Sequence, residues 1–135
     1  MATSPPGAPT RRAYDHTYPG SPEQAHLVRA DLAEFLGDCP RADDAILCAS
    51  ELAANAIQHS RSGRSGGDFT IHAQVHDGDY IWIEIEDGGG DWTETDHLDG
   101  RGHGLAIVRT LASDCGIDGG YVGRAAWFRL NWTTP

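Results

Sequence analysis

The sequence predicts a single α+β domain, a two-layer sandwich in which helices cover one face of a mixed, mostly antiparallel sheet. Two segments with apolar side chains at helical spacing come first in the chain, and two segments of alternating apolar residues follow. A glycine-rich loop then leads into a third helical segment. Hairpin strands combined with helices indicate helices layered on a sheet. The length of 135 residues and the 39% hydrophobic content fit one core.

The N-terminal part of the chain contains a predicted tail and the first helix. Residues 1–13 are rich in proline and small side chains, so we expect a disordered tail before a single domain at 14–135. A short strand is expected near Tyr14 to Tyr18. A helix should begin at Ser21, with Ser21 as its cap and Gln24 completing a capping box. Its apolar stripe contains Val28, Leu32, Phe35 and Leu36.

The middle of the chain predicts a long helix and a hairpin. The helix runs from about Arg41 to Ser60, and the serine- and glycine-rich stretch 61–67 is a loop. Apolar side chains then alternate from Phe69 to His76 and again from Tyr80 to Glu86, with the turn at 77–79 between them. Such a pair of strands buries one of its two faces.

The C-terminal part predicts one more helix and two strands. The helix should span 102–113, after the glycine-rich loop. A strand is expected near Ile117, and a clearer one runs from Ala125 to Trp132. The predicted order is therefore α-α-β-β-α-β-β, preceded by a short strand.

The charged residues of the chain argue against a nucleic-acid-binding protein and against a Walker-type nucleotide site. The formal net charge is −10, so no basic stripe is available to neutralise a nucleic-acid backbone. All ten basic residues are arginine, which excludes a phosphate-binding lysine of the Walker type. Any nucleotide must then be held by backbone amides, arginine or a metal ion.

The cysteines and the hydropathy indicate where the protein works. Cys39, Cys48 and Cys115 form no CxxC pair, and their odd number suggests reduced thiols in a cytoplasmic protein. No apolar run approaches the length that spans a membrane.

The first group of candidate site residues lies on the long predicted helix. Glu51, Asn55 and His59 are spaced by four, so they share one helix face. A carboxylate beside a carboxamide could hold a hydrated Mg²⁺. Glu51 could instead accept a proton from an attacking hydroxyl. A solvated helix face gives the same spacing and stays open as an alternative.

The second group is the sequence Asp87-Gly88-Gly89-Gly90. Counting by two from Ile85 places Asp87 on the inward face of its strand. A buried carboxylate needs a hydrogen-bond donor, for which the exocyclic amine of adenine is suitable. Glycine at 89 lets a flat base approach the backbone. A simple Asp-Gly turn remains the alternative.

The third group is the glycine run from Gly100 to Gly104, which opens the last helix. Its exposed N–H groups and the positive end of the helix dipole suit phosphate oxygens. Arg101 and His103 would add positive charge. A flexible loop before a helix is the alternative, and the run lacks the preceding strand of a dinucleotide-binding motif.

Taken in order, the three groups resemble the sequence boxes of the GHKL ATPase superfamily, in particular the small anti-sigma-factor serine kinases and their actinobacterial relatives. The first box, E-L-x-x-N-A-x-x-H, is complete from Glu51 to His59. The second, D-x-G-x-G, is present as Asp87 and Gly89 but has Asp91 as its last residue. The third, G-x-G-x-G-L, is complete from Gly100 to Leu105. The resemblance covers about residues 14–132.

This resemblance implies a Bergerat-type fold with ATP between the helices and a lid. It implies that Asn55 coordinates Mg²⁺, that Asp87 binds adenine and that Glu51 is the general base. The backbone around Gly100, Arg101, Gly102, His103, Gly104 and Leu105 would hold the phosphates. The implied partners are a sigma factor and an anti-anti-sigma (STAS) protein whose serine is phosphorylated, and relatives are often homodimers.

Two departures from the family pattern bear on this function. Asp91 replaces a glycine below the base, and Ala125 stands where relatives often have a threonine in the adenine network. These changes keep a non-catalytic nucleotide-binding module open beside the kinase. A histidine-kinase catalytic module and an unrelated binding domain are further alternatives.

His72 and His76 lie on the polar face of one predicted strand, with Gln74 between them. Two histidines at this spacing could bind a metal ion, although a solvated strand face explains the same pattern. Trp82 and Tyr80 share one face of the next strand, where they could mark a partner surface or be covered by the chain itself.

Overall fold

The computed structural model describes residues 11–59, 67–88, 104–119 and 123–133. Five strands form one sheet in the order β1-β2-β3-β5-β4. Every neighbouring pair is antiparallel. The described strands therefore form an antiparallel sheet, whereas a mixed, mostly antiparallel sheet was predicted. The strands are β1 (Arg11–Pro19), β2 (Asp68–His76), β3 (Tyr80–Asp87), β4 (Asp114–Gly119) and β5 (Arg124–Asn131).

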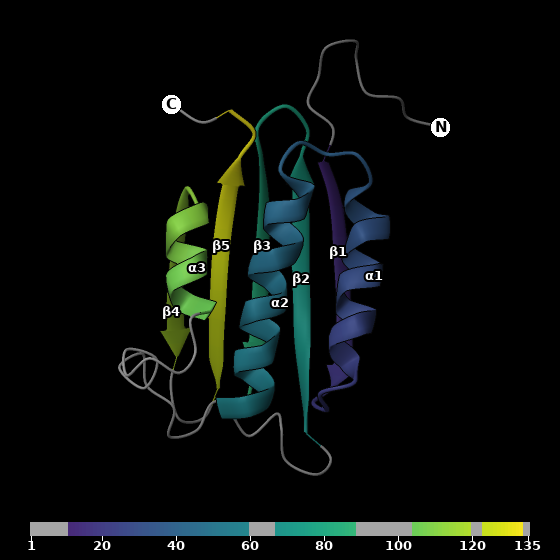
Figure 1. Ribbon diagram of the computed structural model, residues 1–135, viewed down its shortest axis with the longest axis vertical. Coiled ribbons are helices and arrows are strands. Elements are labelled where there is room, and N and C mark those ends of the chain that lie inside the picture. Colours follow the sequence, from purple (N-terminus) through teal and green to yellow (C-terminus); the bar gives the residue numbers. More distant parts are fainter. Residues whose placement is uncertain (1–10, 60–66, 89–103, 120–122, 134–135) are drawn as a thin grey trace.

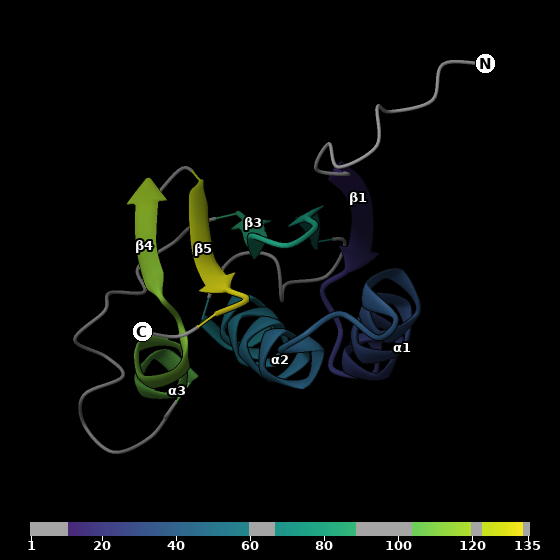
Figure 2. The ribbon, with the colours of Figure 1, turned by 90° about the horizontal axis from the view of Figure 1, so that it is seen from above.

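Three helices cover one face of this sheet, and the described residues place no helix on the other (Figures 1 and 2). They are α1 (Gln24–Leu36), α2 (Ala42–His59) and α3 (Gly104–Leu111). This arrangement confirms the predicted two-layer α+β sandwich. The layers meet in one apolar core because alternate residues of β2 and β3 are buried. Among its fully buried members are Val28, Leu32, Ala53, Ile71, Ile83, Phe128 and Leu130.

The first strand is longer than predicted. Arg11 and Arg12 belong to β1 and pair with His76 and Val75, although they were expected in the disordered tail. The Arg12 guanidinium also donates a hydrogen bond to the carbonyl of Phe35 at 2.7 Å. Pairing with β2 and docking on α1 thus order residues whose local composition predicts a tail. Residues 1–10 lie outside the described residues.

The start of α1 differs from the predicted capping box. The helix begins at Gln24, its N-cap position is Glu23, and no side chain caps it. Ser21 instead takes part in a turn in which its carbonyl accepts a hydrogen bond from the Gln24 amide at 3.0 Å. The helix ends at Leu36, where Gly37 has a positive φ of 59° and donates its amide to the Ala33 carbonyl.

The predicted hairpin and its turn are confirmed. Ile71 pairs with Ile85, so the apolar side chains of both strands share the inner face. Gly78 supplies the positive φ of 80° at the turn. Because β5 pairs with β3, the end of β3 lies beside the beginning of β5, at the end of the sheet where the candidate site lies.

Candidate nucleotide-binding site

The predicted site residues that the structure describes gather at one end of the domain. The end of β3, the beginning of β5, the C-terminal part of α2 and the beginning of α3 all lie at the lower end in Figure 1. The described members of the three sequence groups lie on these four elements. Gly89, Gly100, Arg101, Gly102 and His103, together with Asp91, lie outside the described residues.

Asn55 lies in the last turns of α2 with its side chain directed into the layer between helix and sheet. The residue is 8% exposed. Its Nδ2 atom is buried and has no hydrogen-bond partner among the described residues. An unpaired buried amide is costly and uncommon in folded proteins, so it is a place where a bound group is expected to supply the partner.

Glu51 lies one turn before Asn55 on α2 and is partly exposed. The spacing of four residues places both side chains on one face of the helix. The flanking Leu52, Ala53 and Ala56 are buried in the core, so this face is fixed by the packing of α2. The structure thus confirms a shared helix face for a carboxylate and a carboxamide.

Asp87 is the last residue of β3, and its side chain lies on the inward face as predicted. The side chains of Asp87 and Arg124 are 6% and 5% exposed. Arg124 donates hydrogen bonds to Asp87 Oδ2 from Nη2 at 3.0 Å and from Nε at 3.3 Å. The two residues are directly opposite each other in the β3–β5 register. The buried carboxylate therefore has a cationic partner from the protein.

Arg124 was not among the residues predicted from the sequence. Counting back by two from Phe128 through Ala126 would have placed it on the inward face. The same count places Ala125 on the opposite face, where it pairs with Glu86. Ala125, which stands where relatives often have a threonine in the adenine network, therefore does not face Asp87, and the neighbouring Arg124 pairs with that carboxylate.

The third predicted group is described only at its end. Gly104 begins α3, and Leu105 lies in its first turn. The positive end of the α3 dipole therefore lies at the same end of the domain as Asp87 (Figure 1). The predicted helix start at residue 102 is outside the described residues.

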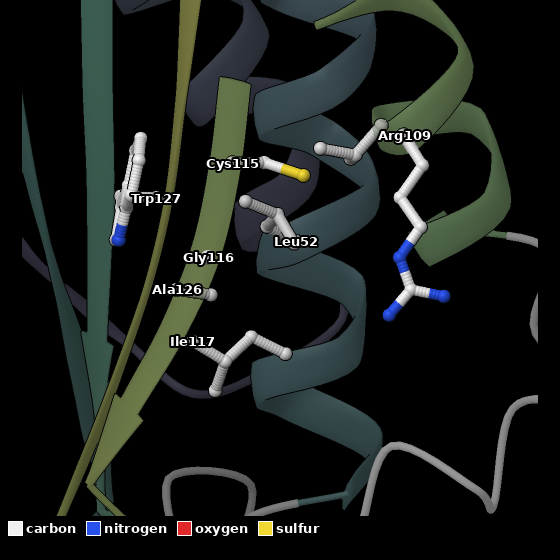
Figure 3. A pocket seen from close by; sticks show the side chains of 8 residues that line it. Leu52, Arg109, Cys115, Gly116, Ile117, Ala126 and Trp127 are labelled. Atoms are coloured by element: carbon white, nitrogen blue, oxygen red, sulfur yellow. The ribbon is translucent and has the colours of Figure 1, made fainter.

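A cavity of about 240 Å³ lies between α2, α3 and the strands β4 and β5. Figure 3 shows Leu52, Cys115 and Ile117 directed into the space between β4 and the helix, whereas Trp127 lies on the other side of the strands. Asn55 and Asp87 are not among its lining residues. The cavity is mainly apolar.

Cys39, Cys48 and Cys115 form no disulfide with one another. Burial raises the pKa of Cys48 to about 12, and the nearby Asp44 carboxylate adds to that increase. Burial also raises the pKa of Cys115, while Arg109 opposes the shift. Both thiols are therefore held in the neutral form, which makes them poor nucleophiles.

No helix in the described part of the chain is long and apolar enough to cross a membrane.

The comparisons with known proteins point to one family. Residues 18–130 match the model of the histidine kinase-like ATPase domain. The crystal structure of the RsbU and RsbW domains of Rv1364c from Mycobacterium tuberculosis superposes with a TM-score of 0.68 at 23% sequence identity. The match covers 88% of this chain but 31% of that one, so the chain spans about a third of its length. Among curated proteins, none shows a significant sequence match.

Proposed function

The chain belongs to the histidine kinase-like ATPase domain family, and on this premise we propose that it binds ATP with Mg²⁺ at the end of the domain that holds Asn55 and Asp87. The observation that carries the proposal is the pair of buried polar side chains there. Asn55 has an amide nitrogen without a partner among the described residues, and Asp87 is a buried carboxylate at the end of a core strand. An unpaired amide nitrogen is uncommon in a purely structural core.

In this proposal each side chain has a separate task. Asp87 accepts a hydrogen bond from the exocyclic amine of adenine, while Arg124 holds the carboxylate in place. Asn55 contributes its amide oxygen to the metal and its nitrogen to a phosphate oxygen. The backbone of Gly89 and of the run from Gly100 to Leu105 surrounds the base and the phosphates.

We further propose that the protein transfers the γ-phosphoryl group to a serine or threonine hydroxyl of a partner protein. The hydroxyl oxygen would form the new bond to phosphorus, the bond between phosphorus and the β–γ bridging oxygen would break, and ADP would leave. Glu51 would accept the hydroxyl proton, from its position one turn away from Asn55. Positioning and charge neutralisation supply most of the catalysis in such reactions.

The proposed partners rest on the resemblance of the sequence boxes to those of the small anti-sigma-factor serine kinases. A domain called RsbW is part of the superposed protein. We propose that this chain regulates transcription in the cytoplasm as an anti-sigma factor, with a sigma factor and an anti-anti-sigma protein as partners, and that it works as a homodimer. The net charge of −10 supports a protein partner over direct contact with nucleic acid.

A non-catalytic nucleotide-binding module is the second candidate. Its support is the ion pair of Arg124 with Asp87, because a carboxylate already bound by a guanidinium can serve the architecture of the domain without a nucleotide. Glu51→Gln separates the two candidates. If the unaltered protein transfers phosphate to its partner and this variant does not, the non-catalytic module is excluded. If the unaltered protein binds nucleotide but transfers no phosphate, the kinase is excluded.

Calorimetric titration of Mg-ATP into the full chain tests the binding site itself. Asp87→Asn should abolish saturable binding, and Asn55→Ala should make the remaining affinity insensitive to Mg²⁺. Gln58→Ala is the matched control, because this exposed residue lies on the same helix three positions from Asn55. A well-folded protein that takes up no nucleotide, or an Asp87→Asn variant that binds normally, would refute the proposed site.

A further inference from the structure

The outer face of the sheet carries a compact group of ionisable side chains away from the candidate nucleotide site. Asp15 in β1 is directly opposite His72 in β2, and His72 is directly opposite Glu84 in β3. Glu86 lies two residues after Glu84 and therefore shares its face. Four side chains from three hydrogen-bonded strands thus meet on a rigid surface, on the side of the sheet that no described helix covers (Figure 2).

Both ring nitrogens of His72 face carboxylates. Nδ1 lies 2.5 Å from Oδ1 of Asp15, and Nε2 contacts Oε1 of Glu86. A neutral imidazole has one N–H and can donate to one of these oxygens only. The second contact therefore requires a further proton, on the ring or on a carboxyl oxygen, or a cation shared by nitrogen and carboxylate.

The negative charge around His72 favours a cation that carries more than one positive charge. Three carboxylates converge on a single imidazole, which can neutralise at most one of them. The ligand atoms of His72, Glu84 and Glu86 all lie within 4.8 Å of one another, close enough to share one ion. A divalent ion would relieve the repulsion among these carboxylates.

We propose that His72, Glu84 and Glu86 form a binding site for a divalent transition metal ion of the Zn²⁺ type. Imidazole nitrogen with carboxylate oxygens is a donor set that Zn²⁺ accepts, whereas Mg²⁺ and Ca²⁺ prefer oxygen alone. Nε2 of His72 would bind the ion, with one oxygen from each glutamate. Three protein ligands leave a fourth position directed to solvent for water or a partner's side chain.

Asp15 completes the site without touching the ion. Metal-bound histidines usually donate their other ring N–H to a carboxylate, which fixes the ring and its tautomer. The contact of Asp15 with Nδ1 supplies this support. A bound ion would link β2 and β3, and through Asp15 also β1.

His76 lies on the same strand face as His72 but has different contacts. His76 contacts Oε1 of Gln74 at 3.1 Å and stacks on Tyr80 with ring centroids 4.2 Å apart. It is not part of the carboxylate group. The ligands that accompany His72 therefore come from the neighbouring strand, and His76 serves as a matched control.

Calorimetric titration of ZnCl₂ into the nucleotide-free full chain tests the proposal, with Co²⁺ absorption as a probe of the ligands. The background should be Cys39→Ser with Cys115→Ser, which removes the two partly exposed thiols as competing ligands. We expect one equivalent to bind and visible Co²⁺ bands to appear. His72→Asn and Glu84→Gln should each abolish saturable binding, and Asp15→Asn should weaken it about tenfold or more. His76→Asn should have no effect.

Three results would overturn the site. The first is the absence of saturable Zn²⁺ binding to the folded background protein. The second is binding that His72→Asn and Glu84→Gln leave unchanged. The third is binding that His76→Asn weakens as much as His72→Asn does, since this would reflect general attraction to an acidic surface. Circular dichroism shows whether each variant is folded. If His72→Asn does not fold, the effect of Glu84→Gln on Zn²⁺ binding decides whether the site exists.

Discussion

Arg124 directs two guanidinium nitrogens at a single oxygen of Asp87, and both side chains are almost completely buried. The pairing follows from the antiparallel register, which places the first residue of β5 opposite the last residue of β3. Burying two charges is costly, and their attraction offsets this cost only while both partners are present. The pair therefore makes the candidate site sensitive to loss of either residue.

Removing one partner of this pair should destabilise the fold strongly. Arg124→Met leaves Asp87 buried without its cation, which should lower the free energy of unfolding by about 3–5 kcal/mol. The double variant with Asp87→Leu should lose less than the sum of the two single changes. Urea unfolding of the four proteins measures this coupling. The exposed Arg29→Met on α1 is the control, and additive losses would contradict the coupling.

The same arginine should affect nucleotide affinity, if Asp87 binds the base as proposed. Arg124 holds the carboxylate in one position, so Arg124→Met should weaken Mg-ATP binding by about tenfold through loss of this preorganisation. Arg124→Lys should lose less because it keeps a positive charge. Titrations at a temperature where every variant is folded measure the effect. Tighter binding by Arg124→Met would show instead that the arginine competes with the nucleotide.

Gly116 in β4 should not tolerate a larger side chain. It is directly opposite Trp127 in β5, and a Cβ atom there would lie 2.8 Å from Nε1 of the indole. Gly116→Ala should therefore displace the Trp127 ring and lower the free energy of unfolding by about 1–3 kcal/mol. Thermal unfolding and tryptophan fluorescence report the two effects. Gly123→Ala is the control, since the nearest atom to its Cβ would be 3.8 Å away.

The buried thiol of Cys48 should make stability fall in alkaline solution. Its pKa is raised to about 12 in the folded protein, above the ordinary value of about 8.5 that applies after unfolding. A group whose pKa is raised on folding stabilises the protein fully below the unfolded pKa and loses this contribution as pH rises toward the folded pKa. Between about pH 8.5 and 12, Cys48 should therefore lower the unfolding free energy by up to about 1.4 kcal/mol per pH unit.

Comparison with Cys48→Ala isolates this contribution, because other groups also titrate in alkaline solution. The variant should be less stable at neutral pH, since it leaves a small cavity. Its unfolding free energy should then decline less steeply above pH 9 than that of the unaltered protein. Parallel slopes in urea unfolding at several pH values would contradict the prediction.

Arg41 connects three elements at the start of α2. It has a positive φ of 65°, and its guanidinium donates to the carbonyls of Leu111 at 2.6 Å and Asn131 at 3.2 Å. It also forms an ion pair with Asp44 at 3.3 Å. Arg41→Met should therefore lower the free energy of unfolding by about 1–3 kcal/mol, since two carbonyls lose their donor. Urea unfolding beside Arg29→Met measures it, and an equal effect of the two changes would refute the role.

The sequence alone determined the elements and the order in which the candidate site residues follow one another. Periodic apolar residues predicted the helices and the hairpin correctly, because burial of one face imposes a period on the chain. Counting by two also placed Asp87 on the inward face. These are local properties, and neighbouring residues suffice to determine them.

Only the tertiary structure decided which distant residues meet. The sheet order β3-β5-β4 brought Arg124 to Asp87. Pairing of β1 with β2 extended the first strand into the predicted tail and brought Asp15 to His72. Register between strands depends on the packing of the whole core and not on local periodicity. Partners such as these therefore became visible only when the strands were aligned.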